Sequence, residues 1–122
     1  MNASVLNESI LDDLRSSVGD DRGFVVDLIE AYLADGENHV AEVEAAMAAG
    51  DAAALVRPAH TLKSSSATVG AESLAATARD LEVAGRSGTL GEGAAEGGAR
   101  LRVAWNEAAV ALRAWIAAGD DG

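Results

Sequence analysis

Apolar residues recur at intervals of three and four along most of this chain, which is the spacing that places them on one face of a helix. The pattern is clearest between residues 20 and 50, where the apolar positions are Val25, Leu28, Ile29, Tyr32, Val40, Val43 and Met47. Acidic residues occupy the other faces of the same segment. No segment alternates apolar and polar residues as a strand would, and 3% aromatic residues disfavour a β-sandwich. The sequence therefore predicts an all-α protein.

Helix-capping residues and glycines divide the chain into five expected helices. They span residues 7–17, 20–49, 51–69, 71–85 and about 90–118. Asn7 is a suitable N-cap for the first helix, and Thr89 with Glu92 has the form of a capping box for the last. Four amphipathic helices with short connections are expected to pack as an antiparallel up-down four-helix bundle. We predict one domain over residues 1–122, with a bundle core at about 20–118 and the short N-terminal helix, 7–17, as a lid.

Glycine and proline weaken three of these helices. Gly36 costs up to about 1 kcal/mol relative to alanine, although one glycine need not end a helix. Pro58 leaves the carbonyl of Ala54 without its helical partner, at a typical cost of about 3 kcal/mol unless the helix bends. We favour a tolerated bend near the N-terminus over a bend that sets the angle of the following residues. The last helix has a glycine-rich start, but its inward register is unbroken: Ala94, Gly97, Leu101, Trp105, Ala108, Leu112 and Trp115.

The charge of the chain excludes several classes of function. The formal net charge is −11, and a surface this acidic repels nucleic acid phosphates and anionic membranes. There is no cysteine, no apolar run of about 20 residues and no signal peptide, so we expect a cytoplasmic protein that does not contact a membrane. The initial Met favours a free-standing protein over a fragment of a larger kinase.

His60 lies on the expected third helix, turned away from its apolar stripe. At 100° per residue, the stripe contains Leu55, Ala59, Leu62, Ser66 and Val69. His60 is about 140° from Leu55 on this wheel, on the same side as Ser64 and Ala67. Lys63, the only lysine of the chain, stands three residues after His60, where helical side chains meet. No acidic residue occurs between Asp51 and Glu72. An exposed imidazole beside a cation and small side chains suits the acceptance of a phosphoryl group.

The segment Ala59-His60-Thr61-Leu62-Lys63-Ser64-Ser65-Ser66-Ala67-Thr68-Val69-Gly70-Ala71 resembles the signature of histidine phosphotransfer (HPt) domains, His-x-Leu-Lys-(Gly/Ser)-Ser-Ser followed by Gly-Ala. Leu81-Glu82 and Arg86 resemble the Leu-Glu and Arg that this family shows near the end of the next helix. The resemblance implies that His60 accepts a phosphoryl group from the aspartate of one response-regulator receiver domain and passes it to another.

The same resemblance implies roles for the neighbours of His60. Lys63 would support the phosphoryl charge, and Ser64 would keep the approach clear where many members have glycine. The face that docks the receiver would include Val56, Arg57, Ala67 and Arg86. Arg86 lies either near the phosphoryl site or merely at the C-terminus of its helix, where cations are stabilising. Hybrid histidine kinases and receiver domains would be the partners of a monomer, and Mg²⁺ would belong to the receiver, with no cofactor or metal in this chain.

The sequence also allows other interpretations of the function and of single residues. The main alternative is a helical adaptor that binds receivers or other partners without carrying phosphate. We expect no enzyme, because a nucleotide-binding loop, a Ser-x-x-Lys at Lys63 and a Glu-x-x-His metal motif are all absent. His39 lacks the context of His60 and is expected to face solvent or a helix flank. Ser66 is expected to bond back to the carbonyl of Leu62.

Overall fold

The computed structural model of the chain describes residues 5–119, except for the side chains of Glu92 and Ala94. Within this range it contains helices and no strand, and the helices are α1 (Glu8–Ser17), α2 (Arg22–Ala49), α3 (Ala52–Thr68), α4 (Glu72–Arg86) and α5 (Glu92–Ala118). The all-α prediction is confirmed. The ends of the predicted domain, residues 1–4 and 120–122, and the side chain of Ala94 in the predicted register lie outside the description. None of the described helices is long and apolar enough to cross a membrane.

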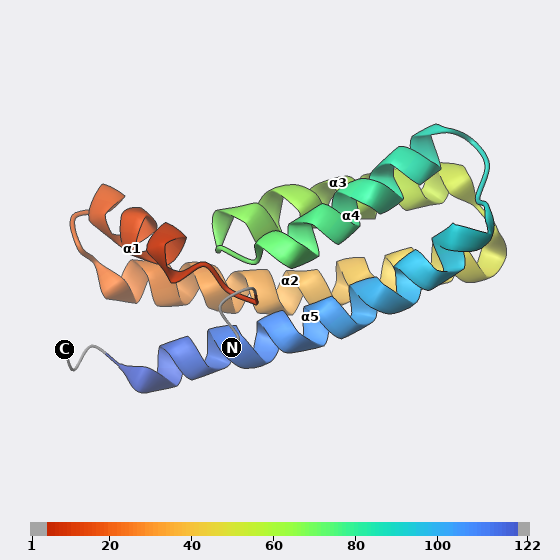
Figure 1. Cartoon of the computed structure of the whole chain (residues 1–122). Coiled ribbons are helices and arrows are strands. Elements are labelled where there is room, and N and C mark those ends of the chain that lie inside the picture. Colours follow the sequence, from red (N-terminus) through yellow and green to blue (C-terminus); the bar gives the residue numbers. More distant parts are fainter. Residues whose placement is uncertain (1–4, 120–122) are drawn as a thin grey trace.

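Helices α2 to α5 run up and down in turn, each antiparallel to the next (Figure 1). The α3–α4 hairpin lies along the two longer helices α2 and α5 and leaves one end of them uncovered. Helix α1 lies on that end of α2, beyond the α3–α4 loop, with Leu6 and Leu11 buried. The expected up-down four-helix bundle with a short extra N-terminal helix is therefore the observed arrangement.

Polar caps set the helix starts as the sequence indicates. The side chains of Asn7, Asp21 and Asp51 each accept a backbone N–H from the first turn of the helix that follows. Gly50 ends α2 in the left-handed conformation, with φ of 66°. The start of α1 is held against the α3–α4 loop, because the backbone N–H of Asn7 donates to the Gly70 carbonyl oxygen at 2.8 Å. An added Cβ on Gly70 would lie 2.6 Å from the Asn7 carbonyl oxygen.

The start of α5 differs from the prediction. The helix begins at Glu92 after Gly91, which makes no side-chain cap, so Thr89 is not the N-cap. The backbone of Thr89 is engaged in the preceding turn, where its N–H lies 3.4 Å from the Ser87 hydroxyl oxygen. Gly88, with φ of 84°, turns the chain at this point. The predicted N-cap, Thr89, therefore lies two residues before the observed N-cap position, Gly91.

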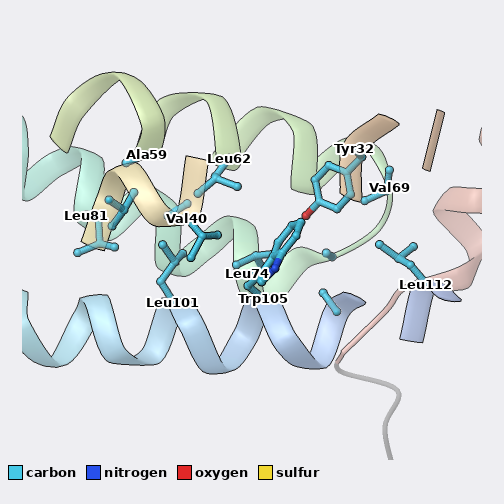
Figure 2. Close-up of a cluster of buried hydrophobic side chains, with 14 of the residues drawn as sticks. Tyr32, Val40, Ala59, Leu62, Val69, Leu74, Leu81, Leu101, Trp105 and Leu112 are labelled. Atoms are coloured by element: carbon cyan, nitrogen blue, oxygen red, sulfur yellow. The ribbon is translucent and has the colours of Figure 1, made fainter. Parts of the chain in front are cut away.

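The core is a continuous layer of aliphatic side chains between the two helix pairs (Figure 2). Its fully buried larger side chains include Leu11, Ile29, Leu55, Leu62, Leu74, Leu101 and Leu112. Trp105 is 3% exposed, as its register predicts. Trp115 is only partly buried, with the Arg22 guanidinium 4.4 Å from its ring centroid.

One polar pair is buried within this core. The Tyr32 and Ser66 hydroxyl oxygens lie 2.7 Å apart, joining α2 to α3. The expectation that Ser66 bonds back to the carbonyl of Leu62 is therefore wrong, because the hydroxyl group of Ser66 is paired with Tyr32 on α2. Burial raises the pKa of Tyr32 to about 12.

Gly36 lets α2 and α5 approach each other. A Cβ at this position would lie 2.3 Å from Cη2 of Trp105, so only glycine leaves room for the indole ring. The ring is also held by its N–H, which donates to Glu37 at 2.9 Å. The residue that weakens the helix locally is therefore required by the packing. Pro58, in contrast, is accommodated: α3 continues through it, and the residue is buried.

The variant Gly36→Ala tests this packing. Alanine favours a helix by up to about 1 kcal/mol, but overpacking a rigid neighbour costs about 1–3 kcal/mol. We expect a net loss in the free energy of unfolding, measured by urea denaturation. The control is Gly93→Ala in α5, where an added Cβ meets nothing within 4 Å, and it should leave stability unchanged or slightly raised. A stabilised Gly36→Ala protein would contradict the contact with Trp105.

Candidate functional site

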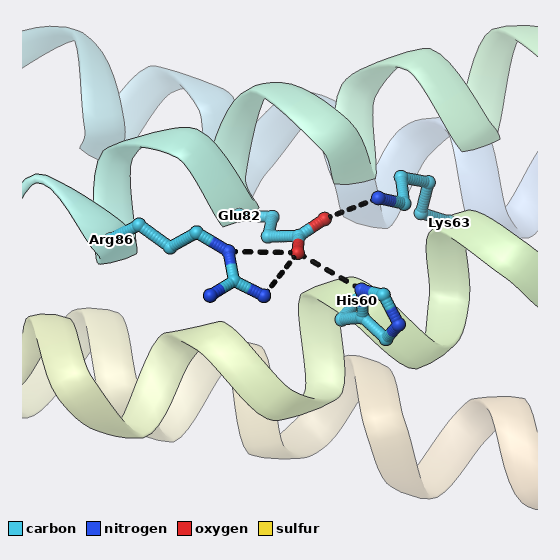
Figure 3. A network of polar contacts seen from close by, with 4 residues as sticks. All are labelled: His60, Lys63, Glu82 and Arg86. Carbon is cyan, nitrogen blue, oxygen red and sulfur yellow. Dashed lines mark hydrogen bonds and ion pairs between the residues drawn. The ribbon is translucent and has the colours of Figure 1, made fainter.

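The site lies where the end of α4 packs closely on the start of α3. Gly85 makes this possible, since a Cβ there would lie 2.9 Å from both the Ala52 carbonyl oxygen and Cγ2 of Val56. The last turn of α4 therefore rests directly on the first turn of α3. Glu82 lies one turn earlier on α4 and consequently reaches the side chain of His60 on α3 (Figure 3).

The Glu82 carboxylate is the centre of the polar contacts at this site. Its side chain is 6% exposed, and three side chains donate to it. The distances are 2.9 Å to Nδ1 of His60, 2.7 Å to Nζ of Lys63, and 3.0 and 2.8 Å to Nε and Nη2 of Arg86. Each contact has a charged partner or an aromatic N–H, and such hydrogen bonds are short and strong.

These contacts determine the protonation of the pair. Hydrogen bonds from Lys63 and Arg86 lower the pKa of Glu82 to about 2, despite burial, which acts in the opposite direction. Glu82 is therefore an ionised carboxylate, which can only accept hydrogen bonds. The His60 nitrogen that faces it, Nδ1, must then carry the hydrogen.

The second ring nitrogen of His60, Nε2, takes no part in the contact with Glu82. The His60 side chain is 53% exposed, and Figure 3 shows the second nitrogen on the side of the ring away from Glu82. A neutral imidazole whose Nε2 faces solvent is a nucleophile that needs no further deprotonation. The arrangement suits nucleophilic attack on an electrophile brought by another molecule.

The structure places the other predicted site residues as follows. Lys63 and Arg86 come together with His60 through Glu82, and Arg86 also lies in the last turn of α4, so both interpretations of Arg86 describe its position. Ser64 and Ala67 are exposed on α3, and Val56 is half-buried against Gly85.

Arg57 is separated from this group. It lines a groove between α2 and α3 together with Glu42, whereas His60 faces α4. His39, the expected control histidine, lies on α2 and contacts Glu42 at 3.2 Å.

Glu82 is the residue of the site to which the sequence interpretation gave no role. Two signals pointed toward it: its spacing of four residues from Arg86, and the absence of an acidic partner for Lys63 within its own helix. The decisive fact is tertiary, since Gly85 sets the distance between α3 and α4. Among the described residues, no cluster of three or more His, Cys, Asp or Glu side chains is arranged to hold a metal ion.

Comparison with known proteins identifies the family of this chain. The model of the Hpt domain family matches residues 27–117. The chain belongs to the Hpt domain family. A crystal structure of histidine-containing phosphotransfer protein B (HptB) from Pseudomonas aeruginosa PAO1 superimposes with a TM-score of 0.79 and 27% sequence identity. The match covers 89% of this chain and 91% of HptB. A search of curated protein sequences found no match.

Membership of the Hpt family makes the chain a histidine phosphotransfer carrier of a phosphorelay. Hpt domains are phosphocarriers rather than catalysts, and they act with the receiver domains and histidine kinases of two-component systems. The helical fold agrees with this family assignment.

The depressed pKa of Glu82 predicts a specific acid sensitivity. A carboxylate whose folded-state pKa lies below its ordinary 4.5 stabilises the fold above that pH, and this stabilisation is lost as the pH falls toward about 2. Urea denaturation of the wild type should therefore show a loss of stability across this window, and Glu82→Gln should show a smaller loss. Parallel pH curves for the two proteins would contradict the ionised network.

Proposed function

We propose that His60 is the phosphoacceptor of this Hpt protein and that it shuttles a phosphoryl group between the aspartates of two receiver domains. The single observation that supports this is the hydrogen bond from Nδ1 of His60 to Glu82 on an exposed side chain, since a neutral ring with its hydrogen on Nδ1 has its lone pair on Nε2. In the forward step, Nε2 attacks phosphorus, the P–N bond forms, and the bond to the aspartate oxygen breaks. The aspartate leaves as a carboxylate, and the reverse step regenerates the neutral imidazole.

The surroundings of His60 are proposed to support this transfer without catalysing it alone. Lys63 is 34% exposed, and its ammonium group lies within reach of the face where a phosphoryl group would stand. Ser64 is small and exposed one turn after His60, so it leaves the approach open. The partner receiver is proposed to supply the Mg²⁺ and carboxylates, since phosphoryl transfer depends on charge neutralisation and positioning.

The docking face is proposed to surround His60 on α3 and α4. It would include the half-buried Val56, the exposed Ala67 and the exposed Arg86. Arg57 would contribute at the margin of this face, because it lies toward α2. A hybrid histidine kinase and a separate response regulator would provide the two receivers, and the chain would act as a monomer in the cytoplasm.

Labelling by a phosphorylated receiver tests the assignment of His60. The wild type and His39→Ala are expected to take up phosphate that is acid-labile and base-stable, whereas His60→Gln takes up none. His39→Ala is the matched control because it removes the other histidine. Labelling that persists in His60→Gln would refute His60 as the acceptor, and binding without any labelling of the wild type would favour the adaptor alternative.

Removal of the Lys63 charge tests its supporting role. Lys63→Ala is expected to slow transfer or to shorten the lifetime of the phosphohistidine by roughly tenfold, within the range of a hydrogen bond to a charged group. Transfer kinetics and phosphate loss provide the measurement. Arg113→Ala, which removes an exposed cation of α5, should behave as the wild type. Equal kinetics for Lys63→Ala and Arg113→Ala would show that Lys63 does not support the phosphoryl charge.

A further inference from the structure

A phosphoryl group on Nε2 changes the charge of the ring, and this charge depends on whether Nδ1 keeps its hydrogen. Attack by a neutral imidazole leaves the ring with a positive charge, since Nδ1 keeps its hydrogen while Nε2 gains phosphorus. We propose that Glu82 is a positioning residue that retains this proton on Nδ1 throughout the transfer cycle, so that phosphorylated His60 stays in its readily cleaved form. The inference rests on the proposed role of His60 as phosphoacceptor.

Retention of the proton determines how easily the P–N bond breaks. When Nδ1 carries hydrogen, the bond breaks with its electron pair going to Nε2, and neutral imidazole leaves. When Nδ1 has lost its proton to water, the same cleavage would have to expel an imidazolate anion, which is a far poorer leaving group. A proton held on Nδ1 therefore makes both transfer steps possible without any proton entering or leaving the site.

Glu82 is placed to hold this proton. It accepts from Nδ1 at 2.9 Å, and its burial shields the contact from water that would otherwise take the proton. The carboxylate also bears the negative charge that a positive ring requires. The charged groups around the ring are Glu82 and Arg86 from α4 and Lys63 from α3 itself.

The two cations strengthen the effect once the phosphoryl group is present. In the unphosphorylated protein, both Lys63 and Arg86 bind Glu82 and offset its charge. A phosphoryl group brings about two negative charges and attracts these cations. Their side chains are 34% and 60% exposed, so they have room to turn toward it. The Glu82 charge is then less offset by cations and faces the protonated ring.

The matched substitution is Glu82→Gln, which keeps the shape of the side chain and removes its charge. A glutamine amide can also turn its NH₂ group toward an unprotonated Nδ1, which would favour the stable, deprotonated form of the phosphorylated ring. We therefore expect the variant to hold phosphate longer than the wild type and to pass it on more slowly.

Phosphoramidate, a small phosphodonor that requires no receiver, allows a direct test on the full chain. The loss of phosphohistidine is followed by ³¹P NMR as a function of pH, with His60→Gln identifying the signal. In Glu82→Gln the rapid phase of hydrolysis is expected to shift to lower pH by about one unit, which lengthens the lifetime at neutral pH roughly tenfold. Asp80→Asn, which removes an exposed acidic charge from the same helix, should retain the wild-type profile.

The ¹⁵N chemical shifts of the phosphorylated ring give a second readout that a merely structural role would not produce. The wild type is expected to show a protonated Nδ1 at neutral pH, and this measurement stands even if Glu82→Gln does not fold. An unprotonated Nδ1 in the wild type, or identical pH profiles for the wild type and Glu82→Gln, would overturn the inference. Failure of phosphoramidate to modify Nε2, together with failure of receivers to label His60, would overturn both proposals.

The two proposals fail in different ways. If phosphoramidate modifies His60 with the expected pH shift but no receiver labels it, the relay role fails and the role of Glu82 stands. If receivers label His60 but Glu82→Gln leaves the pH profile unchanged, the relay role stands and the role of Glu82 fails.

Discussion

The buried carboxylate of Glu82 is the interaction on which the site depends. A carboxylate withdrawn from water is costly unless charged or polar partners compensate it, and here the compensation comes from both α3 and α4. Arg86 reaches it along α4, whereas His60 and Lys63 reach it from α3, against which Gly85 lets α4 pack closely. The packing of α4 on α3 therefore places Glu82 within hydrogen-bond distance of Nδ1 of His60.

The contacts between α2 and α5 stabilise the bundle away from the site. Helices α2 and α5 are held by Trp105, seated over Gly36 and bonded to Glu37, and by Arg102, which bridges Glu37 and Glu44. These contacts lie on elements that do not carry His60. The bundle thus separates a scaffold that fixes the long helices from a hairpin that presents the reactive ring to partners. This division suits a carrier, whose site must stay accessible while the fold remains rigid.

Local sequence signals predicted most of the helices, whereas the contacts between helices could not be predicted from them. The periodicity of apolar residues, the cap Asn7 and the glycines between segments placed four helix starts within one or two residues. The start of α5 was misplaced because a capping box can be read from sequence, but the competing turn at Ser87 cannot. His60 and Lys63 were identified from their motif and spacing. Glu82 was quoted only as part of the family resemblance and given no role, because its distance from His60 depends on how closely α4 packs on α3.

The site has an excess of positive charge, whereas the whole chain is strongly negative. The whole protein carries a net −11, yet at the site Lys63 and Arg86 outnumber Glu82. At physiological ionic strength the Debye length is about 8 Å, so distant acidic residues are largely screened from the site while its own cations act at contact distance. The local cations therefore act on a phosphoryl group only at contact distance, after it has been brought to His60, and do not attract free anions from afar. A protein with this charge distribution favours phosphoryl groups delivered by a docked partner over those diffusing freely.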